Sequence, residues 1–261
     1  LKSYNIKTLD TDKNLGAKLS FSTLLDYAVT NTDANYFMFC DQDDIWEKRK
    51  IELTLRKMLE MEKKSPSIPI LVHTDLNVVD SCLNIIDNSM WKYEHINPKL
   101  NSLNRLLMHN TITGCTMMIN RELAKKCLPI PNECIMHDWW IALIASAFGK
   151  IDYISESTIK YRQHSFNDTG AKKYNYRNIY IKALNLLFGD ELYIKHLRKN
   201  IKQAESFLDS YKNDLDKDTI SMLEDFLNIE NKSFFEKRKF LLKYKLLKYG
   251  MVRNIGLLLR I

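Results

Sequence analysis

Glycine and proline are scarce in this sequence, with 7 and 5 residues among 261. Folds built of many short strands need frequent tight turns, which these two residues favour, so their scarcity favours long helices and buried strands. The cysteines form no Cys-x-x-Cys pair, and their odd number does not suit a disulfide framework. We therefore expect free thiols in a reducing cytoplasm. The cysteines are Cys40, Cys82, Cys115, Cys127 and Cys134.

Long hydrophobic runs are also absent. No segment approaches the roughly 18 uninterrupted apolar residues that a membrane-spanning helix requires, and the first residues lack the basic-then-apolar pattern of a signal peptide. We expect a cytoplasmic protein that is neither exported nor transmembrane, with at most a peripheral contact at the inner face of the plasma membrane.

Hydrophobic residues make up 45% of the chain, enough for a substantial core. Apolar runs at 36–40 and 70–72 flank a helical pattern at 47–64, which predicts a βαβ-like unit whose first strand is buried and parallel. We predict an α/β fold for residues 1–170. The apolar stripe expected on the 47–64 helix is Ile51, Leu55, Met58 and Leu59. Other predicted elements are strands at 5–9 and 111–119 and helices at 15–29, 103–108, 122–127 and 138–148.

Residues 171–261 differ from the rest in charge. They hold 19 basic and 11 acidic residues, a net charge of +8, whereas residues 1–170 hold 20 and 21, a net charge of −1. The apolar spacing of this part predicts a basic helical extension. Its surface is either an ordinary solvated one or a docking surface for anionic lipid or another polyanion. The predicted helices are 176–188, 192–211, 219–227 and 234–259.

Three carboxylates, Asp41, Asp43 and Asp44, follow directly after the apolar run that ends at Cys40. Acids this close repel one another unless a cation or hydrogen-bond donors neutralise them. Mg²⁺ takes oxygen ligands and shares substrate phosphates, and ligands gather at the carboxyl ends of strands in open α/β sheets. The pattern therefore suggests a metal and diphosphate site, and the alternative is an Asp-rich surface turn.

Asp138 opens a predicted helix and is followed by Trp139 and Trp140. An acid in the first helical turn is favoured by the helix dipole, and the two tryptophans would then be core residues. The functional interpretation makes Asp138 a general base that accepts a proton from a sugar hydroxyl, beside aromatic faces that suit a sugar ring. Further along, Arg162 and His164 follow a predicted strand and are either structural residues or contacts to a diphosphate or metal.

Four motifs occur together in a familiar order. They are Phe39-Cys40-Asp41-Gln42-Asp43-Asp44-Ile45-Trp46, Asn110-Thr111-Ile112-Thr113-Gly114-Cys115, His137-Asp138-Trp139-Trp140, and Tyr161-Arg162-Gln163-His164 with Asn167 and Gly170. This combination, across roughly residues 5–170, resembles family 2 glycosyltransferases of the rhamnosyltransferase-like kind. The resemblance implies a partial GT-A fold, a Rossmann-like mixed sheet, followed by the helical extension.

The resemblance also implies an activity. It is inverting transfer of a sugar, with Mg²⁺ or Mn²⁺, from a dTDP- or UDP-linked donor to a hydroxyl of a glycan or lipid-linked acceptor in the synthesis of cell-surface polysaccharide. Asp138 would be the catalytic base. The implied metal ligands are Asp41, Asp43 and His164; the donor-binding residues are Asp41, Asp43, Asp44, Gly114 and Arg162; and the acceptor-binding residues are Asn110, Trp139 and Trp140.

One difference from the family is that its usual first strands and helix have no counterpart here, so we expect a fragment or a truncated protein. Two alternatives have other functions. A haloacid-dehalogenase-like phosphatase would use Asp41 as nucleophile, but that family expects Thr or Val at position 45, where this chain has Ile45. A catalytically impaired chain could instead be a basic binding module, and the mixture of Lys, Leu, Phe and Tyr over 234–259 suits a membrane surface better than nucleic acid.

Overall fold

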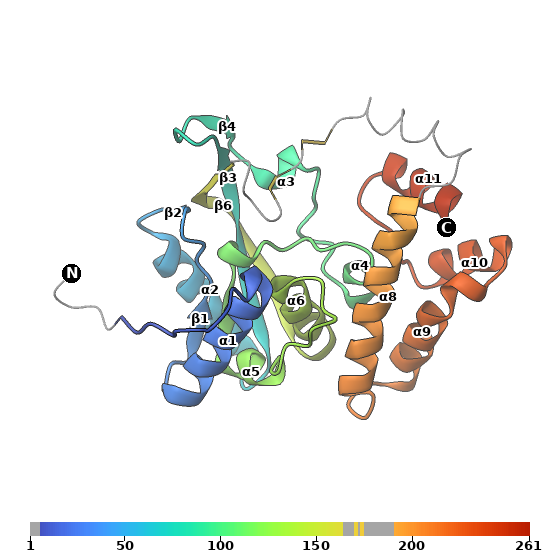
Figure 1. The fold of residues 1–261 in the computed structure, drawn as a ribbon, viewed down its shortest axis with the longest axis horizontal. Helices are drawn as coiled ribbons and strands as arrows, with labels where there is room; N and C mark the ends of the chain where they lie inside the picture. Colours follow the sequence, from blue (N-terminus) through green and yellow to red (C-terminus); the bar gives the residue numbers. More distant parts are fainter. Residues whose placement is uncertain (1–5, 164–169, 172, 175–190) are drawn as a thin grey trace.

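The computed structural model describes residues 6–163, 170–171, 173–174 and 191–261. This part of the chain is a mixed α/β structure in which a mixed sheet is covered by helices, and C-terminal helices pack to one side (Figure 1). The α/β class predicted from the sequence is confirmed. The strands are β1 (Tyr36–Met38), β2 (Ile45–Trp46), β3 (Ile70–Val79), β4 (Ile85–Asp87), β5 (Met118–Asn120) and β6 (Lys150–Arg162).

The direction of the strands sets one functional edge of the sheet. Their order is β1-β5-β3-β6-β2, with β4 paired to β3. β3 and β6 are parallel, whereas β5 is antiparallel to both β1 and β3. The carboxyl ends of β1, β3 and β6 therefore lie at the same edge as the amino end of β5. The strand predicted at 36–40 is present but short, and the prediction of a parallel partner is wrong, because Met38 pairs with Met118 of antiparallel β5.

Side chains alternate across β3 into two cores. Leu71 belongs to the main core, whereas Ile70 and Val72 pack with Met58 on the opposite face. The main core lies between the sheet and α1, α5, α6 and the C-terminal helices. The α-helices are α1 (Gly16–Asn31), α2 (Lys50–Lys64), α3 (Met90–Tyr93), α4 (Leu103–Leu106), α5 (Arg121–Lys126), α6 (His137–Phe148), α8 (Glu191–Tyr211), α9 (Lys217–Leu227), α10 (Phe234–Lys243) and α11 (Met251–Arg260).

Helix α2 turns a different face to the sheet from the one predicted. Ile51 and Leu59 are 54% and 50% exposed, so the predicted stripe is wrong at these two positions. A polar side chain, Lys50, is fully buried and reaches the carbonyl oxygen of Thr116 at 3.4 Å. Counting apolar residues alone could not place Lys50 on the inner face. The buried residues of α2 are Lys50, Leu53, Thr54, Met58 and Met61.

The helix predicted at 138–148 is confirmed as α6, which begins one residue earlier, at His137, and ends at Phe148, with Gly149 as its C-cap. At Gly149 the chain passes directly from α6 into β6, beside the start of β3. A Cβ atom at this position would lie 1.8 Å from the carbonyl oxygen of Pro69. Only glycine fits so close an approach, and this contact fixes α6, and with it Asp138, relative to the sheet.

The C-terminal helices share the main core with the α/β part. Trp140 of α6 meets Phe207 of α8 with ring centroids 6.1 Å apart. Asn200 donates to the carbonyl oxygen of Leu107 at 3.0 Å, and the backbone N–H of Ile135 donates to Gln203 at 2.8 Å. The helices predicted at 192–211 and 219–227 are confirmed as α8 and α9, and the one predicted at 176–188 lies outside the described residues.

The prediction of one helix over 234–259 is wrong. The segment forms α10 and α11, which are separated by residues 244–250. Lys245 and Gly250 have φ angles of 53° and 95°, in the left-handed region that a continuous right-handed helix cannot contain. Because of this break, the two helices can each turn an apolar face to the main core: α10 contributes Phe240 and Leu241, and α11 contributes Leu257.

Of the remaining predicted helices and strands, the helices are confirmed and the extended segments are mostly not. The helices expected at 15–29, 103–108 and 122–127 are confirmed as α1, α4 and α5. Residues 6–9 have no regular structure, and the extended segment expected at 111–119 is mostly a loop and a short 3₁₀ turn, η1 (Gly114–Thr116), that leads into β5. Of the helices that the structure describes, none is long and apolar enough to cross a membrane.

Candidate active site

The acidic segment forms a tight turn after β1. The backbone N–H of Asp44 donates to the carbonyl oxygen of Asp41 at 3.4 Å, and the chain then enters β2 beside β6. Arg162, at the end of β6, donates through Nε to the carbonyl oxygen of Asp43 at 3.1 Å and through Nη1 to that of Ser81 at 2.6 Å. Arg162 therefore holds the acidic turn against the carboxyl edge of the sheet through its backbone.

Two of the three acids converge with a cysteine. A carboxylate oxygen of Asp41, one of Asp44 and the Sγ atom of Cys115 lie within 4.8 Å of one another. This arrangement follows from the strand register, because β5 places the η1 turn opposite the chain that leaves β1. The predicted pair was Asp41 with Asp43. The structure brings Asp44 to this cluster instead, and Asp43 contributes its backbone carbonyl to the contact with Arg162.

The electrostatics of Asp44 are those of a partly desolvated acid. Burial raises the pKa of Asp44 to about 6; contact with the Cys115 thiol opposes this shift, and the charge of Asp41 adds to it. Both carboxylate oxygens of Asp44 are buried, and within the described residues neither accepts a hydrogen bond of ordinary geometry. Burial also raises the pKa of Cys115 well above its usual range, so this residue is a neutral thiol.

A buried cation faces this cluster. The Lys50 ammonium lies 4.9 Å from the centroid of the Trp46 ring and donates to the carbonyl oxygen of Thr116. Burial lowers the pKa of Lys50 to about 8, and the negative charge of nearby Asp44 opposes that shift. Lys50 has no exposed surface, so it can compensate the charge of the acids but cannot itself contact a ligand in solution.

Asp138 lies in the first turn of α6, and both of its carboxylate oxygens accept hydrogen bonds. The backbone N–H of Gly114 donates to Oδ2 at 3.0 Å, and Nδ2 of Asn110 donates to Oδ1 at 3.2 Å. Burial raises the pKa of Asp138 to about 7, hydrogen bonds from the backbones of Trp139 and Gly114 oppose the shift, and the charge of Asp41 adds to it. The residue keeps partial solvent exposure. Asp138 is therefore an oriented carboxylate poised to exchange a proton near neutral pH.

Close packing holds Gly114 against the start of α6. A Cβ atom at Gly114 would lie 2.8 Å from Nε2 of His137. The His137 ring is buried between Phe21 and Phe39, with centroid distances of 4.4 Å and 5.2 Å, so it has little room to move. Glycine at position 114 is thus required for the backbone N–H to reach Asp138.

The η1 turn joins the two acidic groups. Gly114 contacts Asp138 and the next residue, Cys115, contacts Asp41 and Asp44. Consecutive Cα atoms are about 3.8 Å apart, so the two groups flank the same short piece of backbone. The charge of Asp41 is also close enough to raise the pKa of Asp138. The structure thus brings the acidic turn and Asp138 to the same short turn of the chain.

The two tryptophans occupy different environments. Trp140 is 1% exposed, and its indole N–H donates to the carbonyl oxygen of Cys127 at 3.0 Å. The predicted acceptor-binding role of Trp140 is wrong in this structure, because its ring is packed in the core against α8. Trp139 is only partly buried and donates to the carbonyl oxygen of Leu106 at 2.6 Å. His164 lies outside the described residues, so its predicted metal contact has no counterpart here.

The donor set at the acidic turn fits a hard divalent cation. Asp41 and Asp44 offer carboxylate oxygens, the ligand type that Mg²⁺ and Mn²⁺ prefer, and the Asp44 oxygens are short of hydrogen-bond donors. The neutral Cys115 thiol is a soft group and a poor ligand for these ions. The chain would supply two carboxylates to such an ion, and the other coordination positions of the ion would be taken by water and phosphate oxygens.

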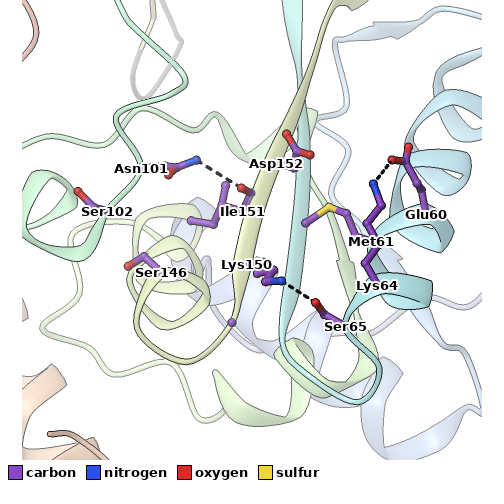
Figure 2. Close-up of a pocket in the computed structure, with 11 residues that line it drawn as sticks. Glu60, Met61, Lys64, Ser65, Asn101, Ser102, Ser146, Lys150, Ile151 and Asp152 are labelled. Atoms are coloured by element: carbon purple, nitrogen blue, oxygen red, sulfur yellow. Dashed lines mark hydrogen bonds and ion pairs between the residues drawn. The ribbon is translucent and has the colours of Figure 1, made fainter.

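A separate cavity of about 380 Å³ lies at the opposite end of the sheet, where β6 begins. Its lysines already have partners: Lys150 donates to Ser65 at 2.6 Å, and Lys64 pairs with Glu60 at 2.6 Å (Figure 2). None of its lining residues belongs to the acidic turn, and the carboxylate of Asp152, which also lines it, pairs with Lys57 at 2.6 Å. It is therefore a weaker candidate for a diphosphate site.

The resemblance implies that Asn110 to Cys115 line the cleft, but the sequence predicts neither the proximity of the Cys115 thiol to Asp41 and Asp44 nor the presence of Lys50. A thiol beside carboxylates has no sequence signature. Lys50 begins α2 four residues after Trp46 of β2, and no local pattern in the sequence indicates that its ammonium group lies beside the Trp46 ring. Comparison of the chain with protein-family models and with curated proteins finds no match.

Proposed function

We propose that this protein is an inverting glycosyltransferase with a GT-A arrangement, which transfers a sugar from a nucleotide-diphosphate donor to a hydroxyl of a glycan or lipid-linked acceptor. The observation that carries the proposal is the η1 turn, whose consecutive residues Gly114 and Cys115 contact the base candidate Asp138 and the acidic pair Asp41 and Asp44. A diphosphate at the acidic pair and a hydroxyl at Asp138 would be neighbours on this turn.

The chemistry assigned to Asp138 is general base catalysis in one displacement. The acceptor hydroxyl oxygen forms a bond to the anomeric carbon of the donor while its proton passes to the Asp138 carboxylate. The bond between the anomeric carbon and the diphosphate oxygen breaks, and its electron pair leaves with the nucleoside diphosphate. Gly114 and Asn110 fix the orientation of the carboxylate, which removes an entropic cost from the reaction.

Asp41 and Asp44 would hold Mg²⁺ or Mn²⁺, which supplies Lewis-acid neutralisation of the departing diphosphate. Asp44 must lose its proton to act as a ligand, and Lys50 stabilises that ionised form from inside the protein. Arg162 keeps the turn in place through the Asp43 carbonyl. A phosphatase with Asp41 as nucleophile has no use for the oriented Asp138 carboxylate, which therefore favours sugar transfer.

The test is a screen for donor hydrolysis and sugar transfer with UDP- and dTDP-sugars, in Mg²⁺, Mn²⁺ or a chelator. Asp138→Asn keeps an oxygen for the Gly114 N–H but removes the base, and we expect activity to fall about 10²- to 10⁴-fold. Asp33→Asn changes an exposed acid before β1 and should leave activity unchanged. Turnover that survives chelation, or full activity of Asp138→Asn, would refute the proposal.

A further inference from the structure

The positive charge of the protein resides in its last two helices. Residues 234–261, which contain α10 and α11, hold eight basic residues and one acidic residue, a net charge of +7. The whole chain also has a net charge of +7, so the other residues, with 31 basic and 31 acidic side chains, are neutral in sum. An anionic surface would therefore attract the molecule by this end.

The same end exposes an unusual amount of apolar surface. In α11, Met251, Val252, Ile255 and Leu259 are 77%, 36%, 49% and 56% exposed. The spacing of these positions places all four on one face of the helix. The opposite face packs inward through Leu257, which is buried in the main core. The helix is thus amphipathic with its second apolar face turned outward.

The start of α10 continues this surface. Phe235 is 80% exposed, and its neighbour Phe234 lies under the guanidinium group of Arg238. Arg238 also donates to the carbonyl oxygen of Ile261, the residue that ends α11, at 3.3 Å. The exposed aromatic pair therefore adjoins the carboxyl end of α11, with a cation between them.

We propose that α10 and α11 form a docking surface for an anionic phospholipid bilayer, into whose interface the apolar face of α11 and the two phenylalanines insert. Basic side chains interleaved with exposed Phe, Ile, Leu and Met are the composition of interfacial helices. Nucleic acid would use the cations and could stack on the phenylalanines, but it has no use for the exposed aliphatic face of α11. Docking requires no unfolding, because Leu257 already anchors α11.

Contacts tie the docking surface to the chain that leads to Asn110, and what they imply for the acceptor rests on the proposed function. Arg253 of α11 donates to the carbonyl oxygens of His95 and Glu94 at 2.7 Å and 2.6 Å. Arg105, at the end of α4, donates to the carbonyl oxygen of Leu247 at 2.6 Å, and the chain beyond α4 leads to Asn110, which holds Asp138. A lipid-linked acceptor is the substrate class that this placement favours.

The experiment is sedimentation of the full chain with phosphatidylcholine vesicles, with and without about 20% phosphatidylglycerol. The double variant Met251→Ser/Ile255→Ser removes part of the apolar face, and we expect its partition to anionic vesicles to fall about ten-fold or more. Ile51→Ser/Leu59→Ser removes the same kind of exposed apolar side chain from α2 and should bind as the wild type does. Circular dichroism checks that each variant is folded.

A second arm tests the charge. Lys237→Gln/Lys239→Gln should reduce partition about 30-fold, from the loss of two basic residues near the surface. Equal binding to neutral and anionic vesicles, or loss of binding in the α2 variant, would overturn the proposal. So would an effect of the lysine variant without an effect of the Met251/Ile255 variant, which is the result expected of a polyanion surface. Asp138→Asn should bind vesicles normally, so failure of the catalytic proposal leaves this result unaffected.

Discussion

Replacing the proposed base should make the protein more stable at neutral and alkaline pH while it abolishes activity. Burial raises the pKa of Asp138 to about 7 from its ordinary 3.8. The folded state therefore holds the proton more tightly than the unfolded state does. Stability contributed by the protonated carboxyl is present below about pH 4 and is lost as the pH rises toward 7, where the folded protein must bury an ionised group. Asp138→Asn removes this cost.

The magnitude follows from the shift and from the two hydrogen bonds. A shift of about three pKa units corresponds to ~4 kcal/mol, and the partial exposure of Asp138 reduces this to about 2–4 kcal/mol. The Asn side chain can accept from Gly114 with its oxygen, but its NH₂ group then faces the NH₂ group of Asn110, which costs about 1 kcal/mol. We expect Asp138→Asn to be about 1–3 kcal/mol more stable than the wild type near pH 8, and slightly less stable near pH 4.

Urea denaturation of both proteins at several values between about pH 4 and pH 8 measures this difference directly. Asp216→Asn is the control of opposite sign, because hydrogen bonds from Thr219 lower the pKa of the exposed Asp216 carboxyl. That variant should lose stability relative to the wild type above the usual range of an Asp pKa, and the loss should disappear as the pH falls. If Asp138→Asn instead destabilises the protein equally at every pH, then Asp138 is an ordinary ionised helix acid and the site is misassigned.

Three further results are expected. Gly114→Ala should destabilise the protein by about 1–3 kcal/mol, because the added methyl group overpacks against His137, and should reduce transfer about 10²-fold by displacing Asp138. Its control is Gly256→Ala, in open space on α11, which should stabilise the protein by up to about 1 kcal/mol. Denaturation and rate assays test both variants. Mn²⁺ binding, followed by electron paramagnetic resonance, should weaken as the pH falls through about 6, because Asp44 is then protonated, and pH-independent binding would contradict this. Lys50→Met should raise Mn²⁺ affinity roughly ten-fold near pH 7, where Lys50 is mostly charged, by removing a buried cation beside the acids, and an unchanged affinity would place Lys50 outside the site.

The parts of the site that could be predicted are those with a local signal. The apolar run before Asp41 ends where a strand must end, and Asp138 follows a loop and opens an apolar helix that stops before Gly149, so both acids could be placed on their elements from local patterns alone. Their proximity could not be derived that way. It depends on β5, whose three strand residues carry little pattern, lying antiparallel between β1 and β3 and thereby bringing Gly114 and Cys115 to the edge.

Two of the failed predictions, the apolar stripe of α2 and the acceptor-binding role of Trp140, concern which side chains are buried. Lys50 is buried because the acidic turn and the Thr116 carbonyl compensate its charge, and Ile51 is exposed as a consequence. Trp140 was assigned to an acceptor by its position beside Asp138, yet adjacent helix residues point about 100° apart, so only one of two neighbours can face a cleft. Whether such a side chain is buried depends on residues far away in the sequence, and the contacts with those residues cannot be read from a single sequence.

The acidic pair and Asp138 are also coupled energetically, because the charge of Asp41 raises the pKa of Asp138. A cation bound at Asp41 and Asp44 would offset this charge, so Asp138 would ionise at lower pH with the metal bound than without it, whereas the anionic diphosphate of a donor would oppose this shift. The Asp138 titration, followed in the absence of donor, should accordingly move to lower pH on addition of Mg²⁺, and Asp41→Asn should produce part of the same shift without any metal. A titration that stays at the same pH in both experiments would mean that the two groups act independently, despite sharing the η1 turn.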